Sequence, residues 1–374
     1  MMNNFGKFLG LAMAVGTLSA SAQVTMTALS SFGGGDGWLA PGEGGYIYLT
    51  TGNNERGIAY GNGDLYLVNH TGGANNIRIL NPLTGADIGS LNTTGISGGT
   101  FGVNTIGVGQ DGTIYAANLT TQSTTSPFRV YSWANNGATP TVAYSGNGGL
   151  AGTRLGDSLA VIGSGASTLL AAGYNSSPVV TGNNGYAILN PTAGTATAIG
   201  FTGTPPNAGD FRLGLTFTDS SHVLGTAGSS LYRSSSFSGS SGTLLASPAI
   251  PDPAGATADR LLAYTLLGGE ALLAIQSIGD SHVSIYNATD PNNPIYIASL
   301  DNTTGTLTAN GNGTGELVWG AITANPDGSV SENLYGMSSN QGIQAFIVTV
   351  PEPGTLALLA IGLAAVVTRK KFRH

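Results

Sequence analysis

Short apolar segments separated by turn residues occupy most of the chain, and they recur in groups of four. The first segments of successive groups are RGIAY from Arg56, NTIGV from Asn104, DSLAVIG from Asp157, FRLGLTF from Phe211, DRLLAYT from Asp259 and GELVWGAI from Gly315. A group recurs about every 50 residues, a period typical of repeat architectures. Each segment is short, rich in apolar residues and bounded by Gly, Asn, Asp or Pro, which predicts β-strands joined by tight turns.

The later segments of each group complete four strands per repeat. Second segments are DLYLVN, GTIYAAN, TLLAAGY, HVLGTAG, ALLAIQ and NLYGMSS; third segments are IRILNPLTG, FRVYSW, YAILNPTAG, SLYRSS, VSIYNATDP and IQAFIVTV; fourth segments are ADIGSL, PTVAYSG, ATAIGF, GTLLASP and PIYIASL. The sixth group lacks a fourth segment, which VTMTALSSF from Val24 can supply from the other end of the chain. That pairing would leave no free sheet edge.

The pattern predicts an all-β fold, a single β-propeller of six or seven four-stranded blades. The matching fragments ILNPLTG and ILNPTAG occupy the same place in two groups, which supports the repeat. The segment GWLAPGEGGYIYLTTG from Gly37 fits either a degenerate seventh blade or a loop into the first blade. The alternatives are a pair of β-sandwiches or a right-handed β-helix, whose coils would recur at roughly 20 to 30 residues.

Both ends of the chain differ from this body. The N-terminus has Lys7, an apolar stretch from Phe8 to Leu18, and then Ala20 and Ala22 just before Gln23. A positive start, an apolar run and small residues at a cleavage position are the form of a secretory signal peptide over residues 1–22. We therefore expect export through the Sec machinery and cleavage by signal peptidase. A buried N-terminal helix is the alternative.

The C-terminus has three parts in order. The prolines of Pro351-Glu352-Pro353 prevent a helix from continuing out of the last strand. An apolar span follows, which includes Leu356, Leu358, Leu359, Ile361, Leu363, Val366 and Val367. With its flanks it covers about 15 residues, or ~22 Å of helix, against the ~30 Å of a bilayer core. The basic tail of Arg369, Lys370, Lys371 and Arg373 places the C-terminal end in the cytoplasm and the body outside.

This arrangement resembles the PEP-CTERM sorting signal: a Pro-Glu-Pro motif, a short membrane helix and a basic end. The resemblance covers residues 351–374 only. It implies an exosortase as a partner, transit through the inner membrane, removal of the tail and delivery to the cell surface or the extracellular, biofilm-forming matrix. The signal is modular, so it leaves the activity of the body, residues 23–350, open.

Composition narrows the classes of function. Cysteine is absent, which excludes disulfides, cysteine nucleophiles and thiolate metal sites. The only lysines, Lys7, Lys370 and Lys371, lie in the terminal segments. The body has seven arginines and eighteen carboxylates, a net charge of −11, so we expect no nucleic-acid partner.

One candidate binding site follows from the propeller topology. Arg56, Asp157, Arg212 and Arg260 lie at or just before first strands, which line the central channel of a propeller. Arginine suits the carboxylates or sulfates of an acidic glycan, so these residues are a candidate channel ligand site. Ion pairs at strand ends are the simpler alternative. Trp38, Trp133 and Trp319 could stack on sugars or be buried in blades.

Other site signals are weaker. Gly95–Gly99 matches G-x-S-x-G but lies in a glycine-rich loop with no helix after it, so we predict no catalytic residue there. His70, His222 and His282 occupy non-equivalent strand positions, which argues against a shared metal. Carboxylates concentrate in turns, where turn chemistry explains them; calcium is the alternative, although no EF-hand-type loop is present. We expect no cofactor.

Three functions remain from different classes. The leading hypothesis is a non-enzymatic, exported binding or structural component of the cell surface or the extracellular polysaccharide matrix. A polysaccharide lyase or glycosidase with its site in the channel is the second. A calcium-dependent adhesion module is the third.

Overall fold

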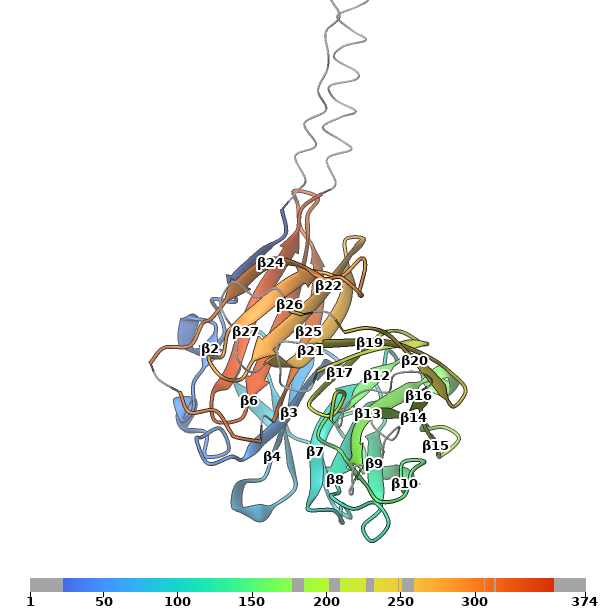
Figure 1. Ribbon diagram of the computed structural model, residues 1–374. Helices are drawn as coiled ribbons and strands as arrows, with labels where there is room; N and C mark the ends of the chain where they lie inside the picture. Colours follow the sequence, from blue (N-terminus) through green and yellow to red (C-terminus); the bar gives the residue numbers. More distant parts are fainter. Residues whose placement is uncertain are drawn as a thin grey trace, which may run out of the picture.

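The fold is a ring of six β-sheets around a central axis, seen in a computed structural model (Figure 1). The structure describes residues 23–176, 185–201, 209–226, 232–247, 249–250, 259–305, 307–312 and 314–352. Blade 1 consists of β3 (Glu55–Gly61), β4 (Asp64–Asn69), β5 (Asn76–Leu80) and β6 (Asp87–Ser90). Blade 2 consists of β7 (Phe101–Val108), β8 (Ile114–Leu119), β9 (Phe128–Trp133) and β10 (Thr141–Gly146). Blade 3 consists of β12 (Ala160–Ile162), β13 (Leu169–Ser176), β14 (Tyr186–Asn190) and β15 (Thr195–Ala198).

Blades 4 to 6 repeat the same antiparallel order from the axis outward. Blade 4 consists of β17 (Gly214–Asp219), β18 (His222–Thr226), β19 (Tyr232–Ser238) and β20 (Ser241–Ala246). Blade 5 consists of β21 (Asp259–Leu267), β22 (Glu270–Ser277), β23 (Val283–Asn287) and β24 (Ile295–Leu300). Blade 6 consists of β25 (Gly315–Ala324), β26 (Val330–Ser338), β27 (Gly342–Val350) and β1 (Thr25–Ala28). Every segment predicted from the apolar pattern contains a strand of a blade, and the propeller prediction is confirmed with six blades.

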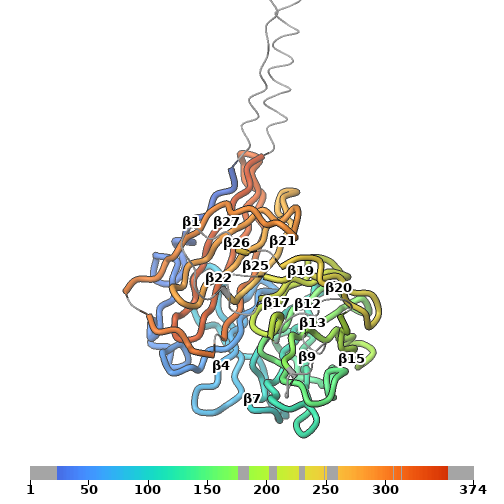
Figure 2. The backbone as a smooth tube through the Cα atoms, in the orientation of Figure 1, coloured from blue at the N-terminus to red at the C-terminus, as the bar shows by residue number. Residues whose placement is uncertain are grey.

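The ring is closed by the two ends of the body. β1 pairs with β27 in antiparallel register, from Thr25 opposite Thr349 to Ala28 opposite Phe346. Figure 2 shows the N-terminal strand lying alongside the C-terminal one. The sixth blade therefore forms only when both ends of the chain come together, as the sequence predicts.

The segment from Gly37 is a connection and not a seventh blade. It contributes β2 (Trp38–Leu39), which pairs with the far end of β27. The Trp38 indole N–H donates to the carbonyl of Gln341 at 2.8 Å, which holds the segment against blade 6. Short 3-10 turns occur at η1 (Gly33–Gly35), η2 (Glu43–Gly45), η3 (Thr71–Gly73) and η4 (Gly165–Ser167).

Two further short strands lie outside the four-strand blades; the first was not predicted, and the second lies within the predicted segment ATAIGF. β11 (Thr153–Leu155) pairs with β13 beside β12, and β16 (Gly200–Phe201) adds to the outer edge of blade 4 in parallel. Gly156 ends β11 with φ +94°, and a Cβ there would lie 1.9 Å from the carbonyl oxygen of Asn118. The inner strand of blade 3 is thus split in two at a glycine that packs against blade 2.

The core lies between neighbouring blades. Between blades 1 and 2, for example, Tyr66 packs with Ile106 and Trp133 in one buried cluster. Trp133 is fully buried, and its indole N–H donates to the carbonyl of Asn92 at 2.8 Å. Full burial of such a side chain stabilises the fold by ~1.5–3 kcal/mol, so blade-to-blade packing holds the ring together.

The predicted signal peptide (residues 1–22) and most of the predicted sorting tail (Pro353 onward, with the apolar span and basic cluster) lie outside the described residues. Within the described part of the chain, no helix is long and apolar enough to cross a membrane.

Candidate functional site

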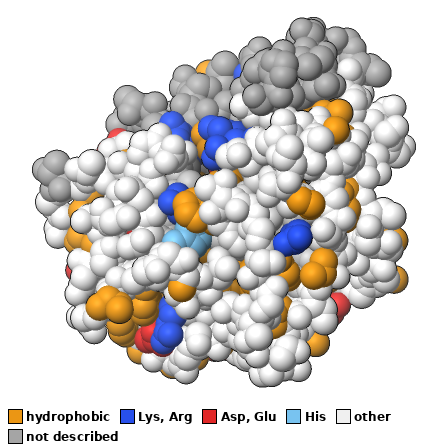
Figure 3. Space-filling view, turned by 90° about the horizontal axis from the view of Figure 1, so that it is seen from below, with side chains coloured by type: hydrophobic (Ala, Val, Ile, Leu, Met, Phe, Trp, Pro, Cys, Tyr) orange, Lys and Arg blue, Asp and Glu red, His pale blue; other side chains and the backbone are white. Residues whose placement is uncertain are grey.

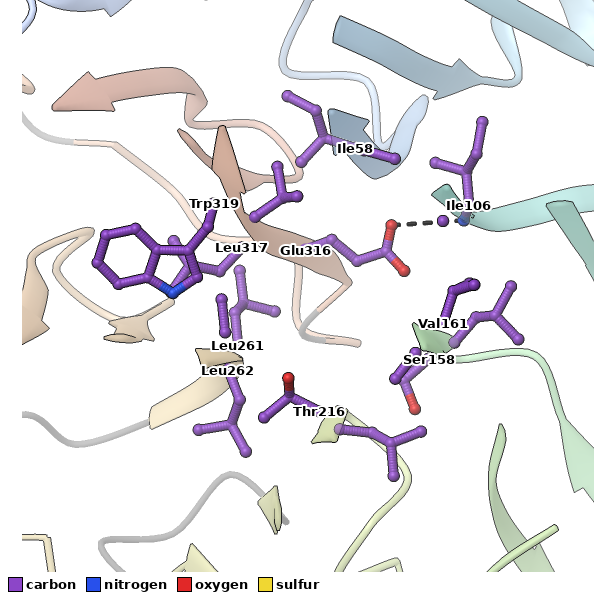
Figure 4. A pocket seen from close by; sticks show the side chains of 18 of the residues that line it. Ile58, Ile106, Ser158, Val161, Thr216, Leu261, Leu262, Glu316, Leu317 and Trp319 are labelled. Atoms are coloured by element: carbon purple, nitrogen blue, oxygen red, sulfur yellow. Dashed lines mark hydrogen bonds between the residues drawn. The ribbon is translucent and has the colours of Figure 1, made fainter. Parts of the chain in front are cut away.

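A channel of about 240 Å³ follows the axis, and the inner strands of all six blades contribute to its wall (Figure 4). Most of the side chains that line it are apolar, with Ile58, Val108, Val161, Leu262 and Trp319 among them. The prediction that first strands line the channel is therefore confirmed. Trp319 faces this space, whereas Trp38 and Trp133 are buried.

One carboxylate, Glu316 of β25, projects into the channel (Figure 4). It accepts hydrogen bonds from the Thr105 hydroxyl, from the backbone N–H of Ile106 at 3.4 Å and from that of Ile58. Burial raises the pKa of Glu316 well above its usual range. A single side chain from blade 6 thus satisfies donors on blades 1 and 2, and Gly57 leaves it room, because a Cβ there would lie 2.6 Å from its Oε2.

At the end of the channel where first strands begin, Asp157 is the centre of an ion-pair cluster. Its side chain is only 2% exposed. Arg154 of β11 donates to both carboxylate oxygens at 2.6 Å, and Arg212 approaches to 3.8 Å. Hydrogen bonding to Asp157 raises the pKa of Arg154.

Two further arginines lie in this cluster without an ion pair to any described carboxylate. The Arg56 Nη1 group donates to the Thr314 hydroxyl at 3.2 Å, and its guanidinium lies 4.8 Å from the Phe101 ring centroid. Burial lowers the pKa of Arg56 and of Arg260, and nearby Arg212 lowers the pKa of Arg260 further. Arg56 also interacts electrostatically with Asp157 and Arg154.

The four arginines therefore gather at one mouth of the channel. We call Arg56, Arg154, Arg212 and Arg260 the arginine mouth. Figure 3 views the molecule from this end, with basic side-chain atoms near the middle of the face. The described carboxylates beside them are Asp157 and Glu55. The Glu55 carboxylate is fully buried and accepts hydrogen bonds from the backbone N–H groups of Thr50 and Asn340.

The sequence predicted three of these arginines and Asp157 together, and the structure places them so. Asp157 does form ion pairs at a strand end, which accounts for Arg154 and Arg212 but leaves Arg56 and Arg260. Arg154 was missed because β11 lies outside the four-strand repeat. Glu316 was missed although a lone acid inside an apolar inner strand was a usable signal.

The opposite end of the channel is acidic. The hairpins that join first and second strands carry Asp64, Asp111, Asp219, Glu270 and Asp327. Asp111 also accepts a hydrogen bond from the backbone N–H of Gly165 in the next blade at 2.7 Å, which places neighbouring hairpins side by side. Hydrogen bonds from backbone N–H groups lower the pKa of Asp111.

The residues behind the remaining weak signals lie in separate parts of the ring. Ser97 of the G-x-S-x-G match lies in the connection between β6 and β7, where Arg129 donates to its carbonyl oxygen at 2.7 Å. His222 pairs with Asp219 at 2.8 Å and His282 with Asp280 at 2.7 Å, in different blades. Among the described residues, no group of three or more His, Asp or Glu is arranged to hold a metal ion.

Comparison with known families gives two matches. Residues 349–371 match the PEP-CTERM protein-sorting motif, which indicates an exported, surface-sorted protein and implies processing by an exosortase. Residues 44–195 match the model of DUF4623, a domain of unknown function. None of the curated proteins matches the chain in sequence.

One solved structure supports the fold, and two more distant ones are similar over most of the chain. A DUF4623 family protein from Bacteroides eggerthii is 17% identical with a TM-score of 0.62, over 89% of this chain and 76% of that chain. A periplasmic gluconolactonase of Pseudomonas aeruginosa is 15% identical with a TM-score of 0.43, over 80% of this chain and 86% of that one. An α-L-arabinofuranosidase of Fusarium graminearum is 12% identical with a TM-score of 0.45, over 79% of this chain and 92% of that one. The last two are too distant to bear on activity.

Proposed function

We propose that this surface-sorted propeller is a binding protein, and that its arginine mouth holds anionic groups of an extracellular polysaccharide. The observation that carries the proposal is the convergence of four of the body's seven arginines on one end of the channel. The sorting motif supports the location, since it indicates delivery to the cell surface.

The chemistry of the arginine mouth supports an anionic ligand. Guanidinium groups form paired hydrogen bonds with carboxylates and sulfates, and partial burial strengthens those bonds by excluding water. Arg56 and Arg260 have no ion pair to a described carboxylate. Burial lowers the pKa of both arginines, and in Arg56 it does so in spite of the opposing charges of Glu55 and Asp157. The rest of the body is acidic, so an anionic polymer would be repelled elsewhere and attracted here.

The geometry favours binding over glycoside hydrolysis. Glycosidases of the common kind need two carboxylates, about 5 Å apart or ~6.5–9.5 Å apart. The residues that line the described channel include one carboxylate, Glu316, and its three hydrogen-bond donors explain it as a link between blades. A lyase or glycosidase in the channel remains the second hypothesis and a calcium-dependent adhesion module the third.

The test is a binding measurement with the body, residues 23–352, whose ring is closed by its own first and last strands. Polygalacturonate, dextran sulfate and neutral dextran are the probes, each at low and high salt. We expect binding to one or both anionic polymers only, weakened about tenfold by Arg212→Gln and by added salt.

Asp327→Asn, in a hairpin at the opposite end, is the matched control and should leave binding unchanged. Equal binding of neutral dextran, or identical effects of the two variants, would refute the proposal.

A further inference from the structure

A second cavity, of about 540 Å³, adjoins the arginine mouth between blades 1 and 2. Its wall comes from three segments: the start of β3 with the residues before it, the connection from β4 to β5, and the start of β7 with the glycine-rich residues before it. They are Gly52, Asn53, Asn54, Arg56, His70, Gly73, Ala74, Asn75, Gly98, Gly99, Thr100, Phe101 and Gly102. We call it the side pocket. Its volume lies in the ~300–1,000 Å³ range of small-ligand sites.

Arg56 is fixed in the side pocket before any ligand arrives. It is 9% exposed; one nitrogen bonds to Thr314, and its guanidinium lies over Phe101. Its Nε atom has no hydrogen-bond partner in the part of the chain that the structure describes. A guanidinium held in place by two contacts and left with a free donor loses little conformational entropy when it binds a carboxylate.

Polar atoms without partners cluster at this pocket. His70 is 7% exposed and its ring stacks on Phe101 at 4.0 Å between centroids. The Nε2 atom contacts the Val103 carbonyl at 2.5 Å, while Nδ1 has no partner among the described residues, as is also true of Arg56 Nε. Unsatisfied buried polar atoms are rare in native proteins, and a partner that binds nearby is one explanation.

The rim of the pocket offers groups that match hydroxyls. The Asn75 side chain accepts a hydrogen bond from Gly102 N–H at 3.1 Å, and among the described residues its amide nitrogen has no recorded partner. Asn54 and exposed Thr100 add further amide and hydroxyl groups. Burial lowers the pKa of His70 to about 4, so at neutral pH the pocket has one cation, Arg56, beside several uncharged donors and acceptors.

We propose that the side pocket seats a single uronate unit of an acidic polysaccharide, with its carboxylate on Arg56 and its hydroxyls on the Asn54 and Asn75 amides. This inference rests on the proposed function and sharpens it, because the channel mouth alone would accept any polyanion. One carboxylate flanked by hydroxyls matches one guanidinium flanked by amides, whereas a polymer of sulfate esters would need more cations.

The test is titration calorimetry of the same body with a galacturonate trisaccharide, its methyl ester and a sulfated galactose trisaccharide. We expect binding of the acid only, reduced at least about tenfold by Arg56→Gln and by Thr100→Glu. Thr100→Glu adds a repelling charge at the exposed rim without disturbing the core. Two variants are the controls: Thr94→Glu, in the same loop but outside the pocket, and Arg212→Gln, at the arginine mouth. Each should change the trisaccharide affinity by less than about threefold.

The failures of the two proposals are distinguishable. Trisaccharide binding that Arg212→Gln abolishes and Thr100→Glu leaves intact would overturn the side pocket but keep the arginine mouth. Tighter binding of the methyl ester or the sulfated sugar would overturn the uronate assignment. Absence of binding to every trisaccharide and every polymer would overturn both.

Discussion

The two ends of the channel are built by the same strands yet carry opposite charges, and only one of them is explained by local chemistry. At the hairpin end, Asp111, Asp219 and Asp327 each accept a hydrogen bond from the backbone N–H two residues later, at 3.0, 2.7 and 3.0 Å. Such Asp turns arise from the turn itself. No turn explains arginines from four different segments at the other end, so that end is where a ligand is to be sought.

The largest expected effect comes from Asp157→Asn at the arginine mouth. Removing the partner of a largely buried ion pair leaves Arg154 and Arg212 uncompensated, so the free energy of unfolding should fall by about 3–4 kcal/mol. Affinity for polygalacturonate should rise, because an anion is removed from the site. Chemical denaturation and binding assays check the two directions. An unchanged stability with weaker binding would contradict this view of the cluster.

A pH-dependent effect should come from Glu332 near the acidic end. Its carboxyl is buried, accepts a hydrogen bond from the Thr265 hydroxyl at 2.9 Å, and burial raises its pKa to about 7. A raised pKa means that the folded state holds the proton more tightly than the unfolded state does. The contribution of this proton to the free energy of unfolding is therefore complete below about pH 4.5 and is lost as the pH rises through 7.

Glu332→Gln should therefore be more stable relative to the native chain at pH 8 than at pH 5, by on the order of 3 kcal/mol. Denaturant titrations at the two pH values measure the difference, with Asp327→Asn as a control. A difference of the opposite sign would show that the carboxyl is stabilised in its charged form.

Glu316→Leu tests the link that this side chain of blade 6 makes to blades 1 and 2. The variant leaves the Thr105 hydroxyl and the N–H of Ile106 without their acceptor, which should cost about 2 kcal/mol. Thermal unfolding measures this, and binding of acidic polymers should persist. Loss of binding with unchanged stability would instead assign Glu316 to a ligand or reaction site and revive the enzyme hypothesis.

The smallest effect is expected at the acidic hairpins. Asp111→Ala removes the acceptor for Thr113 N–H and Gly165 N–H, which should lower the free energy of unfolding by about 1 kcal/mol or less. The effect is modest because Asp111 is exposed, so water can take over part of both hydrogen bonds. A loss comparable to that of Asp157→Asn would remove the contrast between the two ends.

Most of the fold could be predicted because each strand is a local apolar pattern between turn residues. Ring closure through Val24 and IQAFIVTV was also predictable, since the last repeat lacked one strand. Blade number was not, because the segment from Gly37 has strand-like aromatics that become a connection. In it the Tyr48 hydroxyl donates to Asp87 at 2.7 Å, a long-range contact that no local pattern encodes.

The arginine mouth was partly predictable for a topological reason. Residues at the start of first strands must meet at one mouth once the ring closes, which brings Arg56, Arg212 and Arg260 together. Arg154 sits on a strand of three residues that leaves no periodic trace. The side pocket depends on how the β4–β5 connection folds over Phe101, and only the structure reveals it.

The last strand of the body determines at which end of the ring the C-terminal segment begins. β27 ends at Val350, and Glu352 lies against Gly328 of the acidic hairpins, so the chain leaves the ring from that end (Figure 1). A body tethered through its C-terminal segment would turn its acidic hairpins toward the bilayer and present the arginine mouth to the medium outside.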